Sequence, residues 1–499
     1  MTKKTLFLNG WYFTKQPLGS TLEDIKERKE AFRAVNLPHD WLIYQGKELY
    51  EDSTGWYRKV FSCEKQQDYR HEIYFEGVYM DTTVYLNGQV LGEWKYGYSS
   101  FFFDMTPLLQ EGDNELLVRV NYQAPNSRWY SGAGIYRNVY LRKQPKCHFI
   151  TDSLYITPVK KSEDMWQVEV SAELSQECLN QENSILMVQI LDREGTEVSK
   201  AELPFEKAVN QADGIVTAQI MTQVSNPELW NLEEPYLYHC RLVLKDENKV
   251  LDETKERFGF RIFTFDTDKG FFLNGVHVKL NGVCEHHDFG ALGAVFNKEA
   301  MRRKLEILRK MGVNSIRSTH NMPAIGLLEL ADEMGFLIID EAFDMWERPK
   351  TTYDYARFFP QWYRKDVRSW VRGSGAPASG AFPRFALSRV ETPPVCAGRG
   401  LHLHPAWLPA GSVLDVLPRP WAGTGCVGHV APPRPAPGVD GPDLLFFLPG
   451  GLERPQGISR ITMNVPAAVS SLFRRRPVQS VVKRSRRCNE WRKHSPPPA

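Results

Sequence analysis

The sequence predicts two β-sandwiches, then an α/β region, then a C-terminal segment of different character. Three observations support this prediction. Short alternating strands fill residues 1–263, strand–helix repeats replace them between residues 264 and 372, and residues 373–499 hold 20 of the 32 prolines. At 499 residues the chain can hold three or four domains, each with a sizeable core.

Residues 1–145 are predicted to form a jelly-roll sandwich. Apolar and polar side chains alternate in residues 71–80, 82–86 and 115–120, as expected of half-buried strands. Asn87 and Gly88 separate two of the strands, and both residue types tolerate the positive φ of a tight hairpin. Because no helical period of useful length interrupts the strands, a sandwich of jelly-roll type is the simplest fold.

Residues 146–263 are predicted to form an immunoglobulin-like sandwich that carries no chemistry of its own. Its expected strands, separated by polar turns, are residues 154–157, 166–170, 185–190, 215–220 and 238–243. The eight cysteines of the chain are scattered without the spacing of a metal site, and we expect them to be reduced thiols: Cys63, Cys147, Cys178, Cys240, Cys284, Cys396, Cys426 and Cys488.

Residues 264–372 change to a strand–helix pattern. Strands are expected at residues 278–283, 313–317 and 336–339, and helices at residues 298–311, 324–334 and 361–372. Gly312 and Gly335 stand where the first two helices should stop. Strand–helix repeats of this length predict a parallel sheet.

Polar side chains follow each of these three strands. They are His286, His287 and Asp288 after the first, Arg317, His320 and Asn321 after the second, and Asp340 and Glu341 after the third. Buried polar groups destabilise a fold unless they are paired, so packing alone does not account for this set. We predict a binding site there, although the acidic pair 340–341 could equally be structural, bonded to neighbouring backbone.

Several motifs resemble a known enzyme family. The stretches NLPHDW (36–41), STGWYR (53–58) and WYSGAGIYRN (129–138) together resemble the N-terminal domain of glycoside hydrolase family 2. PELWNL (227–232) and RFGFR (257–261) resemble its second domain. The resemblance covers about the first 372 residues and implies the start of a (β/α)8 barrel from residue 264. It also implies retaining hydrolysis of a terminal β-linked sugar, and CEHHD at 284–288 favours a β-galactoside.

The resemblance also implies roles for single residues. His286 and His320 match positions that contact sugar hydroxyls or stabilise the transition state, and Asp288 completes a His-His-Asp pattern. Arg317 matches an arginine that holds the nucleophilic glutamate.

Other implied positions lie outside the three strand ends. Asn87 matches a sugar-binding position, with a plain turn residue as the alternative, and Trp129 and Tyr130 could stack on a sugar or simply pack at a domain junction. Met345 stands at or near the position of a magnesium-binding glutamate in some relatives, so neither a metal nor another cofactor is expected.

The carboxylates of a retaining glycosidase are missing from the expected positions. The chemistry needs two carboxyl groups about 5–5.5 Å apart. The family takes its acid/base from an Asn-Glu ending strand 4 and its nucleophile from a glutamate ending strand 7. Here residues 373–380 read GSGAPASG, and the Asn-Glu at 489–490 follows a basic run instead of a buried strand. We assign no catalytic residue, and we expect an inactive chain or a non-catalytic carbohydrate-binding protein.

The charge balance also changes at residue 373. Residues 373–499 carry 14 Arg and 2 Lys against 6 acidic residues, a net +10, which leaves −8 for the rest of the chain. The change favours a fusion or a shifted reading frame, and a disordered or non-native segment. Nucleic-acid binding by basic residues 474–476 and 483–487 is not expected, because interleaved aromatics are absent. Without a long apolar run or a signal core, we expect a cytoplasmic protein with no membrane contact.

Overall fold

The computed structural model describes residues 1–26, 31–44, 49–181, 183–247 and 249–373. The predictions for residues 374–499, including the two basic runs and the Asn-Glu at 489–490, lie outside the described residues.

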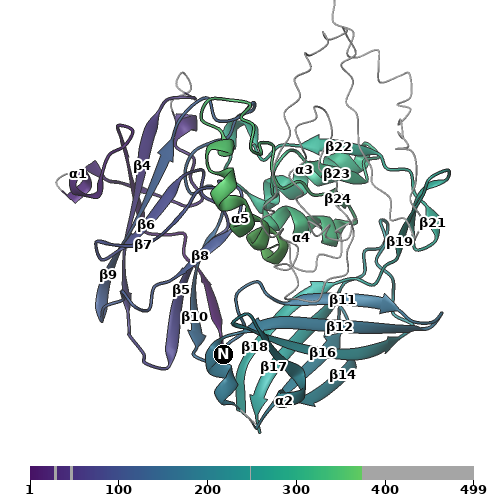
Figure 1. The fold of residues 1–499 in the computed structure, drawn as a ribbon. Helices are drawn as coiled ribbons and strands as arrows, with labels where there is room; N and C mark the ends of the chain where they lie inside the picture. The colour runs from purple at the N-terminus through teal and green to yellow at the C-terminus, as the bar shows by residue number, and fades with distance from the viewer. Residues whose placement is uncertain (27–30, 45–48, 182, 248, 374–499) are drawn as a thin grey trace, which may run out of the picture. The chain divides into compact units, whose positions relative to one another are not determined.

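Two antiparallel sheets form the first sandwich, which confirms the predicted jelly roll (Figure 1). One sheet has the order β3-β2-β4-β9-β6-β7 and the other β1-β10-β5-β8. The strands are β1 Lys3–Leu6, β2 Trp11–Gln16, β3 Arg33–Val35, β4 Ser53–Cys63, β5 Tyr69–Phe75, β6 Thr82–Leu86, β7 Gln89–Trp94, β8 Phe101–Asp104, β9 Gly112–Tyr122 and β10 Val139–Pro145. Two short helices, α1 Leu22–Lys26 and the 3₁₀ turn Leu42–Tyr44, lie among them.

The turn between β6 and β7 forms as predicted. Asn87 has φ 51° and Gly88 has φ 76°, the positive values that a two-residue hairpin of this kind requires. The predicted strand at 71–80 is wrong in its second half, since β5 ends at Phe75. Beyond it the backbone of Tyr79 pairs with Gly134 of the loop before β10 instead of continuing the sheet.

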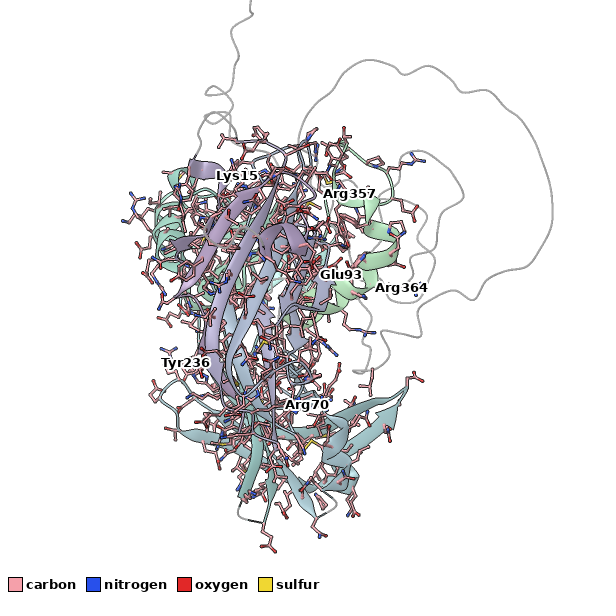
Figure 2. All side chains as sticks on the ribbon, turned by 90° about the vertical axis from the view of Figure 1, so that its left-hand side faces the viewer. Lys15, Arg70, Glu93, Tyr236, Arg357 and Arg364 are labelled. Atoms are coloured by element: carbon pink, nitrogen blue, oxygen red, sulfur yellow. A yellow bond between two sulfur atoms is a disulfide. The ribbon has the colours of Figure 1, made fainter. Side chains whose placement is uncertain are left out.

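A second pair of antiparallel sheets confirms the immunoglobulin-like sandwich. Their orders are β11-β12-β16-β15 and β14-β13-β17-β18. The elements are β11 Tyr155–Lys160, β12 Met165–Leu174, β13 Ser184–Leu191, β14 Glu197–Pro204, β15 Val209–Ala212, β16 Ile215–Ser225, β17 Tyr238–Asp246 and β18 Lys249–Phe258, with helix α2 Phe205–Ala208 and the 3₁₀ turn η3 Gln176–Asn180. Arg70 of the first sandwich, labelled in Figure 2, pairs with Glu177 of η3 at 2.5 Å.

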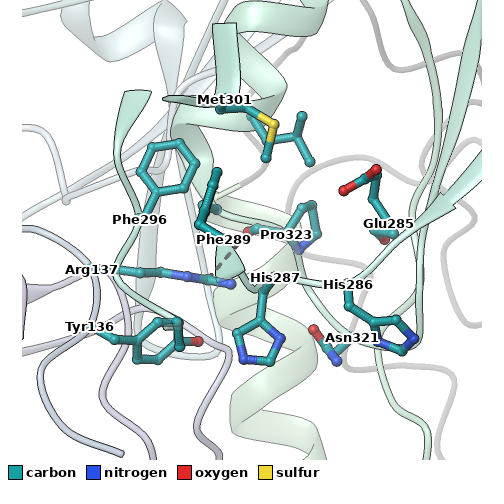
Figure 3. Close-up of a pocket in the computed structure, with 14 residues that line it drawn as sticks. Tyr136, Arg137, Glu285, His286, His287, Phe289, Phe296, Met301, Asn321 and Pro323 are labelled. Carbon is teal, nitrogen blue, oxygen red and sulfur yellow. Dashed lines mark hydrogen bonds between the residues drawn. The ribbon is translucent and has the colours of Figure 1, made fainter. Parts of the chain in front are cut away.

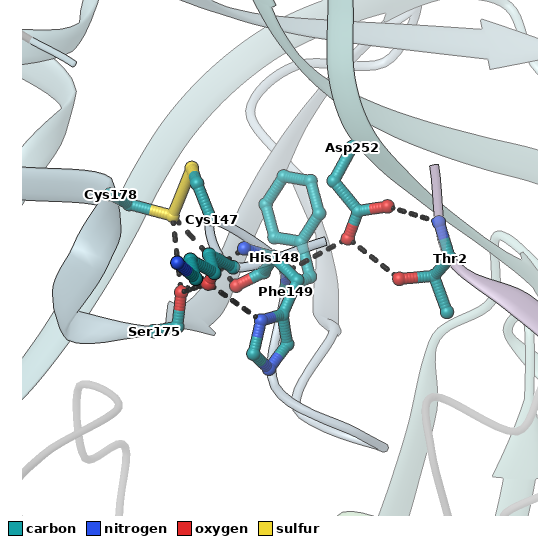
Figure 4. The surroundings of a disulfide bond; sticks show 8 residues. Thr2, Cys147, His148, Phe149, Ser175, Cys178 and Asp252 are labelled. Atoms are coloured by element: carbon teal, nitrogen blue, oxygen red, sulfur yellow. Dashed lines mark hydrogen bonds between the residues drawn. A yellow bond between two sulfur atoms is a disulfide. The ribbon is translucent and has the colours of Figure 1, made fainter. Parts of the chain in front are cut away.

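The expectation that all cysteines are reduced thiols is wrong for one pair. Cys147 and Cys178 form a disulfide between the segment entering the second sandwich and η3 (Figure 4). Their separation of 31 residues gave no sign of pairing, because the fold, and not the spacing, brings their Cα atoms to 4.6 Å. Asp252, which is 1% exposed, lies nearby and accepts hydrogen bonds from the backbone amides of Thr2 and Phe149.

Three parallel strands with covering helices form the third region, as predicted for the first units of a barrel (Figure 1). The sheet order is β22-β23-β24. The elements are β19 Phe263–Asp266, β20 Gly270–Leu273, β21 Val276–His277, β22 Gly282–Glu285, α3 Lys298–Lys310, β23 Ser315–Ser318, α4 Ile325–Met334, β24 Leu337–Ile339 and α5 Phe359–Gly373, with 3₁₀ turns at Gly290–Leu292 and Tyr355–Arg357.

The ends of these elements follow from local chemistry. The Asn297 side chain accepts a hydrogen bond from the amide of Ala300 and so caps α3 at its N-terminus. Gly335 takes a left-handed conformation at φ 68° and ends α4. The strand expected at 278–283 was placed too early, because pairing with β23 begins only at Gly282, opposite Ser315.

The core of the first sandwich continues into the third region. Met322, Phe343, Tyr355 and Phe359 belong to the same buried cluster as the aromatic side chains of the sandwich. Arg137, which is 2% exposed, donates hydrogen bonds to the carbonyls of Tyr98 and Met322 at 2.8 and 2.9 Å. The sandwich therefore holds the loop after β23 directly against its own surface.

Candidate functional site

Three predicted residues meet at the carboxyl ends of β23 and β24. Glu341 accepts a hydrogen bond from Arg317 Nε at 2.7 Å through Oε1, and its Oε2 lies 3.1 Å from His320 Nδ1. Arg317 also lies 3.2 Å from the same His320 nitrogen. Burial alone would raise the pKa of Glu341, but the hydrogen bonds from His320 and Arg317 hold that pKa below its usual value. Both carboxylate oxygens are engaged, so Glu341 orients the arginine and the histidine.

A second layer of hydrogen bonds fixes this cluster. Ser318 Oγ accepts from the backbone amide of Glu341 at 2.9 Å and donates to Asp340 Oδ1 at 3.1 Å. Trp370 of α5 donates its indole N–H to Asp340 Oδ2 at 2.7 Å. The carboxylates of Asp340 and Glu341 are therefore held by side chains from β23, from the loop after it and from α5.

His286 and His287 differ in their surroundings. The carbonyl of Ser131 lies 2.8 Å from His287 Nε2, and because a carbonyl can only accept, the proton sits on Nε2. Burial lowers the pKa of His287 to about 4, which leaves Nδ1 as a bare acceptor. Burial also lowers the pKa of His286, and the neighbouring His320 adds to the effect. The Nδ1 atoms of His286 and His287 are buried and have no hydrogen-bond partner among the described residues.

A tryptophan from the first sandwich forms one wall of the site. The ring centre of Trp129 lies 5.0 Å from that of His286 and 5.6 Å from that of His320. Its indole N–H donates to the Tyr98 hydroxyl at 3.2 Å, which fixes the ring. The first sandwich and the third region thus build the site together.

Two small cavities adjoin at Asn321, which is 4% exposed. The first, of about 30 Å³, is lined by His286, His287 and Arg137 among others (Figure 3). The second, of about 20 Å³, is lined by Trp129 and His320 among others. The Nδ2 atom of Asn321 is buried and has no partner among the described residues. Each volume suits one or two water-sized groups.

Two predicted residues lie apart from the cluster. Asn87 donates its two amide protons to Leu108 O and Asn114 Oδ1, and its Oδ1 accepts a hydrogen bond from the backbone amide of Glu115. These bonds stabilise its own hairpin, and Asn87 lines neither cavity. Asp288 also lines neither cavity, but its charge opposes the lowering of the pKa of His286 and His287.

Sequence reasoning missed several residues that shape the site. Asp40, with no exposed surface, accepts hydrogen bonds from the Tyr130 hydroxyl at 2.6 Å and from the amide of Ala294 at 3.0 Å. The hydroxyl of Tyr130 is therefore engaged within the protein. Asp344 lines the second cavity beside Met345. Asp40 lies inside one of the quoted motifs, while nothing in the local sequence distinguished Asp344.

Neither a metal cluster nor a membrane helix is found in the described part of the chain. None of its groups of three or more His, Cys, Asp and Glu is arranged to hold a metal ion. Among the described residues, no helix has both the length and the apolar character needed to cross a bilayer.

Comparison with known proteins identifies the family. Family models described as glycosyl hydrolases family 2 match three consecutive ranges: the sugar binding domain at residues 25–145, the family 2 model at 148–261 and the TIM barrel domain at 266–351. A β-galactosidase of Bacteroides ovatus is 41% identical over 353 residues, which are 68% of this chain and 41% of that protein. A β-glucuronidase of Bacteroides fragilis is 30% identical, over 61% of this chain and 46% of that protein.

Solved structures give the same result. A glycosyl hydrolase family 2 member from Bacteroides cellulosilyticus has a TM-score of 0.67 and 32% identity, over 75% of this chain and 50% of that one. A β-glycosidase from Bacteroides vulgatus has a TM-score of 0.65 and 30% identity, over 75% of this chain and 49% of that one. The chain spans less than half of the length of the two curated relatives described above. Through its two sandwiches and the beginning of its barrel, the chain belongs to glycosyl hydrolase family 2.

Proposed function

We propose that this protein binds the terminal sugar of a β-galactoside-like glycoside, and that the complete barrel of which it carries the first units hydrolyses that sugar with retention. The arrangement of Arg317, His320 and Glu341 beside Trp129 supports the proposal most strongly. It places an oriented imidazole and an aromatic face at the second small cavity, with a fixed cation 3.2 Å from that imidazole. Sugars are recognised by such a combination of hydrogen-bonding groups and a flat apolar ring.

The charge state of the histidines favours a neutral sugar. Burial lowers the pKa of His286 and His287, so both rings are uncharged near pH 7 and can exchange neutral hydrogen bonds with hydroxyl groups. The β-galactosidase of Bacteroides ovatus is more similar to the chain than the β-glucuronidase of Bacteroides fragilis. We therefore propose a galactoside before a glucuronide.

We further propose that the 499 residues bind sugar without hydrolysing it. Retention requires two free carboxyl groups about 5–5.5 Å apart. Near the cluster, Glu341 is held by Arg317 and His320, and Glu285 pairs with Lys304 at 2.8 Å. In that respect the chain itself would act as a non-catalytic carbohydrate-binding protein, the alternative to a hydrolase.

The test is calorimetric titration of the full chain with galactose, glucuronic acid and mannose, together with release of nitrophenol from the corresponding β-glycosides. We expect galactose to bind, binding to weaken at least tenfold in Arg317→Met, and nitrophenol not to be released. The matched control is Arg302→Met, which removes an arginine of α3 that pairs with Glu333. Failure of all three sugars to bind contradicts sugar binding, and tighter binding of glucuronic acid contradicts the galactoside preference. Turnover above the buffer rate contradicts the inactivity of the chain.

A further inference from the structure

One carboxylate oxygen of Asp344 has no hydrogen-bond partner in the described part of the chain. The residue lies in the loop after β24, and its side chain is 5% exposed. Its Oδ1 accepts hydrogen bonds from Arg128 at 2.8 Å and from Lys350 at 2.6 Å. Its Oδ2 is buried and has no hydrogen-bond partner among the described residues. A buried carboxylate oxygen without a partner destabilises the fold, so this atom requires a physical explanation.

The surroundings of Asp344 point to a hydroxyl group as the partner. Asp344 lines the cavity of about 20 Å³ together with Trp129, His320 and Asn321. The amide nitrogen of Asn321 is also buried without a partner among the described residues. Two residues that line one water-sized hollow thus each carry a buried polar atom, one an acceptor and one a donor, without a partner among the described residues. A hydroxyl group donates one hydrogen bond and accepts others, so it can satisfy both atoms at once.

The two cations also fix where the oxygen points. Arg128 comes from the first sandwich and Lys350 from the third region, and both contact the same Oδ1 atom. With Oδ1 held from two sides, the plane of the carboxylate is set and Oδ2 keeps its place at the cavity. A preorganised acceptor of this kind discriminates between ligands better than a mobile one.

We propose that Asp344 selects the sugar by accepting a hydrogen bond from one of its ring hydroxyls through Oδ2, while Asn321 donates to the same hydroxyl. This inference rests on the proposed sugar binding and adds to it a residue that decides which hydroxyl pattern is accepted. A sugar that lacks the recognised hydroxyl leaves both polar atoms unpaired in the bound state.

The experiment compares the full chain and its Asp344→Asn variant in titrations with galactose and with 2-, 3-, 4- and 6-deoxygalactose. For the wild type, we expect one deoxy sugar to bind at least about tenfold more weakly than galactose, because the loss of a hydrogen bond to a charged group weakens binding by that order. In Asp344→Asn, the amide oxygen stays with the two cations and an N–H replaces Oδ2. Galactose should then bind at least about tenfold more weakly, and the penalty for that deoxy sugar should disappear.

Two further variants separate the possible outcomes. Asp152→Asn, which removes a carboxylate paired with Arg142 elsewhere in the molecule, should keep both galactose affinity and the deoxy penalty. Arg128→Met leaves Oδ1 held by Lys350 alone, so the penalty should become smaller but remain. A penalty lost in Arg128→Met but unchanged in Asp344→Asn would overturn the proposal, because the arginine would then be the discriminating group. If Asp344→Asn binds galactose with the deoxy penalty unchanged, the role of Asp344 is overturned, while the proposed sugar binding stands. Absence of any sugar binding by the wild type overturns the proposed function and this inference together.

Discussion

Removal of the Cys147–Cys178 disulfide should destabilise the second sandwich by several kcal/mol. The bond joins residues 31 apart in sequence. Closing a loop of that length lowers the entropy of the unfolded chain enough to stabilise the fold by about 3.7 kcal/mol at 25 °C. Cys178 has no exposed surface, so the double variant Cys147→Ala/Cys178→Ala also loses some packing, which adds to the effect.

The assay is urea unfolding followed by tryptophan fluorescence, with protein prepared under oxidising conditions. With an unfolding slope of about 1–3 kcal/mol per M of urea, the midpoint of the second sandwich should fall by more than about 1 M in the double variant. The control, Cys63→Ser, changes a thiol outside the disulfide and should leave the midpoint unchanged. Non-reducing peptide mapping should find the two cysteines in one linked peptide. Separate peptides, or equal midpoints for wild type and double variant, would refute the reasoning.

Two further predictions concern stability. Asp366 of α5 has no exposed surface, and burial raises its pKa to about 7. Between about pH 4 and pH 7, the native state therefore keeps a proton that the unfolded chain has released. The free energy of unfolding should fall as the pH rises through that window. Urea midpoints at pH 5 and pH 8 should therefore differ less in Asp366→Asn than in the wild type, and an equal difference would contradict the assigned cause. Gly335→Ala should lower stability by more than about 1 kcal/mol, because φ is 68° and a Cβ would lie 2.3 Å from the carbonyl oxygen of Leu232. Chemical denaturation of this variant beside Gly312→Ala, whose Cβ would meet open space, separates the clash from the strain of the positive φ alone.

The parts of the fold that sequence predicted well depend on local chemistry. Asn87-Gly88 and Gly335 carry their conformational preference within one or two residues, so the hairpin and the end of α4 were predictable. The strand at residues 278–283 was misplaced because alternation of side chains does not reveal where a neighbouring strand begins to pair. The Cys147–Cys178 disulfide was missed for a similar reason, since backbone pairing of residues 148–150 with residues 173–175 brings these cysteines together.

The candidate site shows the same division. Arg317, His320 and Glu341 were found because the carboxyl ends of neighbouring parallel strands necessarily meet. The contact of Arg137 with Met322 spans 185 residues and joins two domains. No local pattern in either segment encodes it. For Asn87, the hydrogen bonds of the side chain follow from its place in the local turn, and the role implied by the family resemblance stays a prediction.

The position of Trp129 has a consequence for how such enzymes diversify. Because this ring belongs to the N-terminal sandwich and yet touches two histidines of the barrel, part of the candidate site is encoded far upstream of the barrel. Exchange of the first sandwich alone would therefore replace one wall of the proposed sugar site while leaving every barrel codon untouched.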